Sequence, residues 1–447
     1  MKPILTLLLL IGLSPLFAGD HSFSGMSDKR HDEMKEHLDN AEREGSFWER
    51  AYLTGDWNGG RSKLARDGVT ISSSYVADIL GNPVGGEARG IAFAGSLGVD
   101  LNIDFGKFSQ LKGLEFYTSV VARTGTNLSA DKIGNQFVVA QVYGGQNIRY
   151  NELYLKLTLL SGKIILKGGR LNGGNDFLQS ELYYKYVNNG FDGNPVSIFL
   201  NSSAFVAYPN AEWGFLLEFY PYKRILAKFA AYVAEPDVIE NKYHGFNWTF
   251  NGSDGALLMT EWSYQVNQLK DDTGYPGNYR AGYYYVTDQS GSKFSGGHYH
   301  GDWGYYFLID QMIYRHGDKE SGRGLTPFIA LLFAPKDRNL LPFYLTSGLV
   351  YKGLFSSRPH DYTNIGVIYG KYSSSLHSAQ VLAKKMHLLG PFGNRPQNYE
   401  AVIELNHWFQ INKWFQVVPD IQYIINPKGF GNIPNALVIG AQVGVIF

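Results

Sequence analysis

The last thirteen residues of the chain, 435–447, constrain its fold more than any other stretch. One parity is apolar throughout, from Leu437 to Phe447, and the other is smaller and less hydrophobic, with Gly440 and Gln442 among its members. A repeat of two residues predicts a β-strand rather than a helix. An apolar final strand suits a transmembrane β-barrel, whose outer face meets lipid and whose last strand pairs with the first. We therefore predict an all-β, antiparallel transmembrane barrel.

The same alternation recurs along the chain. Between Gly90 and Phe105 one parity is apolar, while Asp100 and Asp104 lie on the other. Such a stretch exceeds the usual length of a soluble strand but suits a tilted strand that crosses an apolar band of about 25 Å. Further alternating stretches begin at Leu114, Leu153, Trp213, Tyr399 and Phe415.

The connections support an even strand count. Starting at Val69, we count roughly sixteen strands, which short and long joins connect alternately. Pro195 to Phe205 is placed inside a loop, because a seventeenth strand would break this alternation. In Trp303 to Arg315 the inward parity stays open, since Asp310 and Gln311 are adjacent and both polar. The short joins are Ser161-Gly162, Pro221 to Arg224 and Ile411 to Lys413, and the long, extracellular ones are Thr124 to Gln146, Leu171 to Ala211, Glu235 to Gly255, Asp288 to Gly301 and Ser373 to Gln397. Gln268 to Gly277 and Gly353 to Tyr362 are long for periplasmic turns.

The N-terminus predicts export. A basic Lys2 precedes the apolar core Ile4 to Leu13, and residues 1–18 are predicted to be a signal peptide, cleaved after Ala18. No later segment offers the roughly 18 unbroken apolar residues of a transmembrane helix. Residues 19–52 form a polar periplasmic arm, which its charge pattern allows to be either helical or disordered.

The barrel is predicted to occupy residues 53–447. Ahead of its first strand, Asp56 is placed to cap a short helix that runs to Arg66 and stops at Gly68.

Composition and motifs exclude several functions. The chain has no cysteine, a formal net charge of +0 and a pI near 7.2, so thiolate chemistry and a broad nucleic-acid surface are absent. The run His298-Tyr299-His300 with Asp302 has a metal-like spacing, but a loop of Gly, Ser and Tyr favours plain surface. No nucleophile elbow or phosphate loop occurs. We expect no enzyme, no cofactor and no metal.

Several motifs carry a family resemblance that extends over nearly the whole chain from Leu53. The opening run 53–61, LTGDWNGGR, and the closing hairpin 418–427, VPDIQYIINP, are the clearest, together with Gly169-Arg170-Leu171 and Ala211 to Gly214. In these motifs the sequence resembles the carbohydrate-selective porins of the OprB family. The resemblance implies a sixteen-stranded outer-membrane porin that passes mono- or small oligosaccharides down their gradient. Asn58 departs from the usual glycine, and the 19–52 arm is too short for the envelope-anchoring domain of some relatives.

The longest loop, Leu171 to Ala211, is the expected constriction, because the lumen of such a barrel fills with water unless something narrows it. A selective sugar pore needs charged and amide groups beside aromatic rings, with binding weak enough for release. Any one of these charges can instead be a solvated lumen residue or part of a rim ion pair. The candidate pore-lining residues are Asp100, Asp104, Glu115, Arg123, Arg170, Asp176, Glu218, Arg280, Arg358, Asp361, Glu404 and Asp420.

The expected partners are outer-membrane lipid, lipopolysaccharide, small sugars and the barrel-assembly machinery, which would read the final strand ending in Phe447. Porins commonly trimerise, so a homotrimer is one assembly open to the chain, and no nucleic acid is expected. Two other functions stay open at this point. One is a general or other-solute outer-membrane channel or surface antigen, and the other is a soluble secreted β protein that binds glycans.

Overall fold

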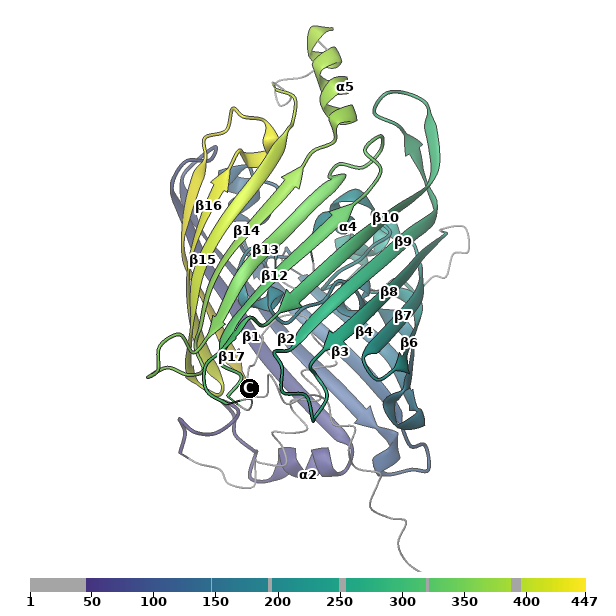
Figure 1. Cartoon of the computed structure of the whole chain (residues 1–447), viewed down its shortest axis with the longest axis vertical. Coiled ribbons are helices and arrows are strands. Elements are labelled where there is room, and N and C mark those ends of the chain that lie inside the picture. Colours follow the sequence, from purple (N-terminus) through teal and green to yellow (C-terminus); the bar gives the residue numbers. More distant parts are fainter. Residues whose placement is uncertain (1–45, 146, 192–194, 249–254, 319–320, 387–394) are drawn as a thin grey trace, which may run out of the picture.

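The computed structural model describes residues 46–447 except 146, 192–194, 249–254, 319–320 and 387–394. The predicted signal peptide and most of the 19–52 arm lie outside these residues. The described chain forms one closed antiparallel barrel (Figure 1). Its strands are β1 (Val69–Val84), β2 (Gly90–Asp104), β3 (Leu114–Gly125), β4 (Asn147–Leu159), β5 (Ile164–Leu171), β6 (Glu212–Tyr222), β7 (Ile225–Val233), β8 (Ala256–Val266), β9 (Gly277–Ser292), β10 (His298–Gln311), β11 (Tyr314–Arg315), β12 (Gly324–Phe333), β13 (Phe343–Lys352), β14 (Tyr362–Lys371), β15 (Tyr399–Asn412), β16 (Phe415–Ile425) and β17 (Ala436–Ile446).

Helices are short and few in the described chain. None of them has the length and hydrophobicity needed to cross a bilayer. The α-helices are α2 (Gly60–Arg66), α3 (Gly173–Asp176), α4 (Ser197–Asn201) and α5 (Ser374–Lys385), and single-turn 3-10 or π helices lie at Phe105–Lys107, Ser129–Ile133, Leu160–Gly162, Tyr183–Lys185, Pro236–Ile239, Asn241–Tyr243 and Pro427–Gly429.

The first and last strands close the barrel as the C-terminal pattern predicts. Tyr75 of β1 lies opposite Val445 of β17 on one side and opposite Leu97 of β2 on the other. The sheet contains seventeen segments, but β10 and β11 both pair with β12 and are one interrupted strand. The predicted count of sixteen strands is confirmed.

Side-chain exposure follows the predicted alternation. On β2, Ile91 is 79% exposed on the outer face, whereas Asp100 is buried on the inner face. The parity that the sequence left open is also settled. Asp310 of β10 is buried inside the barrel, and Trp303 and Phe307 are exposed on its outer face.

The connections differ at the two ends of the barrel, here called the long-loop end and the short-turn end. Helix α5 projects from the long-loop end, at the top of Figure 1, and α2 lies at the short-turn end. Pro195 to Phe205 contains α4 and no strand, as predicted. The join expected from Asp288 to Gly301 is shorter than predicted, because β9 and β10 pair beyond the main wall as far as Ser292 and His298.

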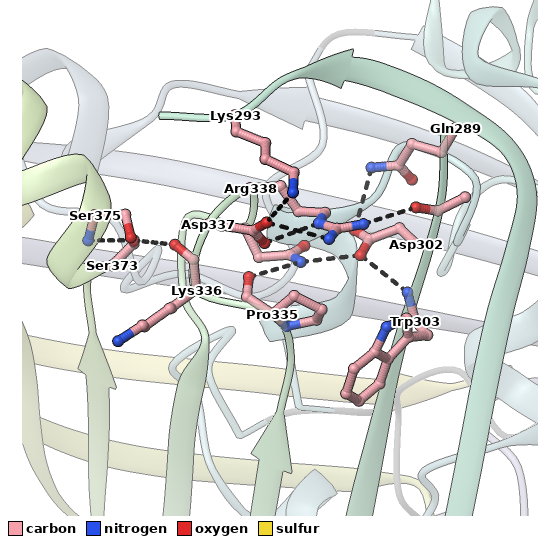
Figure 2. A network of polar contacts seen from close by, with 12 residues as sticks. Gln289, Lys293, Asp302, Trp303, Pro335, Lys336, Asp337, Arg338, Ser373 and Ser375 are labelled. Atoms are coloured by element: carbon pink, nitrogen blue, oxygen red, sulfur yellow. Dashed lines mark hydrogen bonds and ion pairs between the residues drawn. The ribbon is translucent and has the colours of Figure 1, made fainter. Parts of the chain in front are cut away.

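A polar network fixes the rim where β10 meets the join between β12 and β13 (Figure 2). Buried Asp302 accepts bonds from the Trp303 N–H, at 2.9 Å, and from the Asn339 amide, at 3.1 Å. The carboxylate of Asp337 pairs with Arg338, at 2.9 Å, and with Lys293, at 3.1 Å. The hydrogen bond from Arg338 is the main cause that lowers the pKa of Asp337, whereas burial raises the pKa of Asp302 in the same network.

The segment before β1 covers the seam between the first and last strands. The Asp56 carboxylate accepts the Ser62 N–H at 2.8 Å in the first turn of α2, and the helix gives way to a left-handed Gly68 with φ of 89°, as predicted. Arg61 of α2 donates to the Phe447 carbonyl at 2.8 Å and stacks over the Tyr52 ring. The helical segment thus joins the start of the barrel to its last residue.

Candidate constriction of the lumen

The loop 172–211, between β5 and β6, follows the inner wall of the barrel from β4 to β15. It starts beside β4 and reaches inward-facing polar groups of later strands in the order of those strands. This path places the longest loop inside the lumen, as its length predicted. Asn172 N–H donates to Glu152 of β4 at 3.2 Å, Leu178 N–H to Glu261 of β8 at 3.1 Å, the Ser180 hydroxyl to Asp310 of β10 at 3.3 Å and Val187 N–H to Glu404 of β15 at 2.7 Å.

Lys185 anchors the far end of this path. Its carbonyl accepts three bonds, from the side chains of Asn364 at 3.1 Å, Asn406 at 3.0 Å and Trp408 at 3.1 Å. Its ammonium group lies over the rings of Tyr362, at 4.4 Å, and Trp408, at 4.8 Å. A charged side chain buried between two aromatic faces retains a favourable partner after losing water.

Inward-facing glycines make room for aromatic residues of the loop. A Cβ added at Gly366 of β14 would lie 2.7 Å from atoms of both Tyr186 and Phe191, closer than real contacts allow. The Tyr186 hydroxyl then donates to the Ile365 carbonyl at 3.0 Å. We call the inner faces of β13, β14 and β15 the docking wall, because they receive the loop.

A second loop, 126–146 between β3 and β4, also folds inward, which the sequence analysis did not predict. Phe137 is fully buried, and its ring fills the space beside Gly370 of β14. Glu400 of β15 accepts the N–H groups of Gln136 and Phe137, each at 2.8 Å. The signal was present in the apolar run from Phe137 to Ala140, which is unusual in a loop that faces water.

The two inward loops bond to each other. Gln141 N–H donates to the Val187 carbonyl at 2.9 Å, and Asn189 N–H donates to the Val138 carbonyl at 2.8 Å. The Asn188 amide bridges them further by donating to the Phe137 carbonyl at 3.2 Å. The constriction is therefore a two-loop unit rather than a single loop.

The inner faces of β3 to β10 carry cross-strand ion pairs instead, and we call them the ionic wall. Three pairs keep part of their surface open to the lumen, with side chains 10–16% exposed. A fourth pair joins Lys167 of β5 to Asp176 of the loop 172–211. The pairs are Glu115–Lys156 at 3.7 Å, Glu218–Lys228 at 3.9 Å, Arg280–Asp310 at 3.1 Å and Lys167–Asp176 at 3.1 Å.

Arg123 of β3 lies beside an aromatic ring where loop 172–211 returns to the wall. Its guanidinium carbon is 4.6 Å from the centre of the Tyr208 ring, and it donates to the Tyr143 carbonyl at 3.1 Å. The Tyr208 hydroxyl lies 3.3 Å from that of Ser96. Tyr208 is half-buried, so a ring face, hydroxyls and a cation meet within reach of the lumen.

Arg170 lies within the wall rather than on the lumen surface, contrary to its prediction as a pore-lining residue. It is 0% exposed, pairs with Glu235 at 2.8 Å, and donates to the carbonyls of Asn247 and Ala211. It ties the base of loop 172–211 to loop 234–255. Asp176, Glu404 and Asp420 are likewise covered in the structure, because loop backbone and side chains occupy the lumen in front of them.

Three predicted residues lie at the short-turn end, away from the constriction. Asp104 accepts the Gly106 N–H at 3.0 Å, and Arg358 pairs with Asp361 at 2.7 Å, so these groups hold turns. Asp100 lies deeper, where its carboxylate accepts the Tyr117 hydroxyl at 2.7 Å. In the described part of the chain no three His, Asp or Glu residues come together in a way that could hold a metal ion.

A sixteen-stranded barrel with loops folded into its lumen is the architecture of an outer-membrane porin. The sequence profile described as "Carbohydrate-selective porin, OprB family" matches residues 88–447, and the chain belongs to that family. It is accordingly a passive sugar channel of the outer membrane and not an enzyme, as the sequence analysis predicted.

Individual relatives agree with this membership. The chain is 28% identical over 424 residues to Porin B of Pseudomonas aeruginosa, with 89% of this chain and 91% of the relative covered. It is 24% identical to the putative porin QuiX of Acinetobacter baylyi, covering 90% of this chain and 94% of that one. The high-pH structure of Pseudomonas putida OprB superposes with a TM-score of 0.83 at 26% identity, covering 90% of this chain and 100% of that one.

Proposed function

We propose that this porin selects small neutral sugars, mono- or short oligosaccharides, by weak contacts along one side of the narrowed lumen. The observation that carries the proposal is the pairing of opposite charges on the ionic wall. Paired charges offer hydrogen-bond donors and acceptors to the hydroxyl groups of a solute. They do not form a ring of like charges, which would select ions. A neutral, hydroxyl-rich solute fits such a surface better than a salt ion does.

Arg123 and Tyr208 are the proposed first contacts. The ring face of Tyr208 offers a platform for the C–H patches of a sugar, while Arg123 and Ser96 supply groups for its hydroxyls. Glu115, Glu218 and Arg280, each in a partly exposed pair, are proposed as further contacts along the path. Asp100 bonds to neighbouring strands, and the other predicted residues are proposed to act on the pore through turns or loops.

Conductance of the purified protein in a planar bilayer tests the proposal. We expect sugars to block the open channel at millimolar concentration, and amino acids of similar size to block it poorly. Tyr208→Ala should weaken the sugar block about fivefold, the effect of roughly 1 kcal/mol of lost contact. Tyr222→Ala is the control, because Tyr222 is 72% exposed at the short-turn end. Absence of sugar block in the unaltered protein would refute the selectivity.

The proposed orientation puts the short turns in the periplasm and the long loops outside the cell, after removal of residues 1–18. The chain lacks cysteine, so single introduced thiols report on each end. Ser378→Cys on exposed α5 should react with an impermeant maleimide on whole cells, whereas Ser109→Cys in an exposed short turn should not. The reverse labelling would invert the orientation.

We also propose that lipopolysaccharide contacts the outer rim. Lys371 is exposed on the outer face of β14, directly opposite Phe343 and Tyr399 in neighbouring strands. A cation among interfacial aromatic residues suits a phosphate at headgroup level. Recognition of the strand ending in Phe447 by the assembly machinery, and a homotrimer, stay part of the proposal.

A further inference from the structure

The carboxylates Glu400 and Glu404 of β15 hold the two inward loops by the same contact. Each is fully buried, and each accepts consecutive backbone N–H groups from one loop. Glu404 receives Val187 N–H at 2.7 Å and Asn188 N–H at 3.0 Å. Glu400 receives the corresponding pair from loop 126–146, Gln136 and Phe137.

Backbone donors are the main compensation for these buried charges. Among the ion pairs of the described residues, neither Glu400 nor Glu404 has a lysine or arginine partner. Glu404 also accepts a bond from the Asn406 amide at 2.8 Å and hydrogen-bonds with Asp420, and Glu400 also accepts the Lys428 N–H at 2.5 Å. A buried carboxylate that lost its loop donors would keep an unfavourable, poorly solvated charge, so each loop is held firmly against the wall.

Both glutamates lie on one strand and on one face, four residues apart, and the two loops they hold are bonded to each other. We infer that Glu404, supported by Glu400, is a positioning residue that sets the aperture by holding the two-loop unit back against the docking wall. The sugar would never touch these carboxylates. Their effect on selectivity would pass through the position of the loop backbone.

Glu404→Gln is the direct test. The amide keeps the shape of the side chain but replaces one acceptor oxygen by an NH₂ group, which opposes the loop N–H groups. The loop should leave the wall and enter the lumen, so mean single-channel conductance should fall and its fluctuation should rise. Amide hydrogen exchange at Val187 and Asn188 should accelerate, while exchange in the strands stays slow. Glu404→Asp, which keeps both oxygens, should restore part of the conductance.

Asp272→Asn is the matched control. Its carboxylate also accepts a backbone N–H, that of Leu269 at 2.9 Å, and pairs with Arg224 at 2.6 Å, but it lies in the join between β8 and β9, away from the two inward loops. We expect wild-type conductance from this variant. Should Glu404→Gln fail to fold, Glu400→Gln tests the same idea through the other loop.

Unchanged conductance and exchange in a folded Glu404→Gln protein would overturn the inference, and so would a rise in conductance, because the glutamate would then narrow the pore. The inference rests on the proposed function only for its effect on sugar block. If the unaltered channel shows no sugar block, the proposed selectivity fails, while the conductance and exchange measurements still decide the role of Glu404.

Discussion

The ionic wall and the docking wall have the same strand architecture, but their inward-facing side chains have different partners. Both belong to antiparallel strands with polar or small residues inside and apolar residues outside. On β3 to β10 three pairs of opposite inward charges lie on neighbouring strands, whereas Glu152 and Glu261 accept bonds from the loop 172–211. On β13 to β15 the inward glycines and glutamates find loop residues instead, as Gly366 and Glu404 do.

This difference separates contact with solute from placement of the loops. The two charges of a cross-strand pair offset each other, so their polar atoms that face the lumen can stay accessible to a solute. The glutamates of the docking wall need loop donors to offset their burial, so the loops are bound there. In the proposals made above, one side of the barrel meets the solute and the other side sets the width of the passage.

The largest expected effect comes from a pair buried within the wall. Arg170→Ala removes the guanidinium that pairs with buried Glu235, and breaking such a buried pair costs about 3–5 kcal/mol of unfolding free energy. Arg224→Ala breaks a solvent-screened pair with Asp272 and should change the unfolding free energy far less. Urea unfolding of both variants measures the contrast. Equal losses would contradict the assignment of Arg170 to a buried structural role.

A smaller effect is expected at the inward-facing glycines of the docking wall, which make room for aromatic residues of the loop. Gly366→Ala should cost about 2 kcal/mol and alter conductance, because the added Cβ displaces Tyr186 and Phe191. Gly98→Ala is the control, since its Cβ would meet only Ser74, at 3.8 Å. Unfolding and single-channel recording of the two variants test this. If Gly366→Ala changed neither stability nor conductance, the packing of the loop aromatic residues would not depend on the space at Gly366.

On the ionic wall the expected change is in selectivity rather than stability. Glu218→Gln removes a lumen charge beside Lys228, so the zero-current potential in a salt gradient should shift toward anions. Its stability should change by less than about 1 kcal/mol. Glu240→Gln breaks an exposed loop pair with Lys242 and should leave selectivity unchanged. A shift in the control but not in Glu218→Gln would refute the open ionic wall.

The smallest effect is expected at Asp420. It is almost fully buried beside Glu404 and hydrogen-bonds with it, so an asparagine can take its place and donate to that carboxylate. Asp420→Asn should therefore leave conductance and sugar block within about twofold of wild type, a difference below roughly 0.5 kcal/mol. A strong loss of sugar block in bilayer recording would instead place Asp420 in contact with the solute.

The sequence predicted the wall of this protein well, because strand faces are a local property. Alternation near Gly90 and near Phe447 was enough to say which side chains face lipid, since successive residues of a strand point in opposite directions. Where Asp310 and Gln311 stand side by side the local pattern is ambiguous, and only pairing with β9 and β12 decides it.

The sequence predicted which loop forms the constriction, but not the path of that loop or the residues that it contacts. Loop length alone indicated that the segment after Leu171 narrows the lumen. Its path was not predictable, because it depends on contacts between residues far apart in the chain, such as Val187 with Glu404 and Phe137 with Glu400. The same contacts cover Glu404 and Asp420, which as inward-parity charges had looked like pore lining.

By itself the sequence determined a closed barrel, its two faces and the polarity of its lumen, since these follow from a two-residue repeat and from the need to satisfy every backbone group in lipid. The tertiary structure alone decided which inward charges stay open to a solute. That choice depends on where two loops dock, and docking is a property of strands that meet only when the barrel closes.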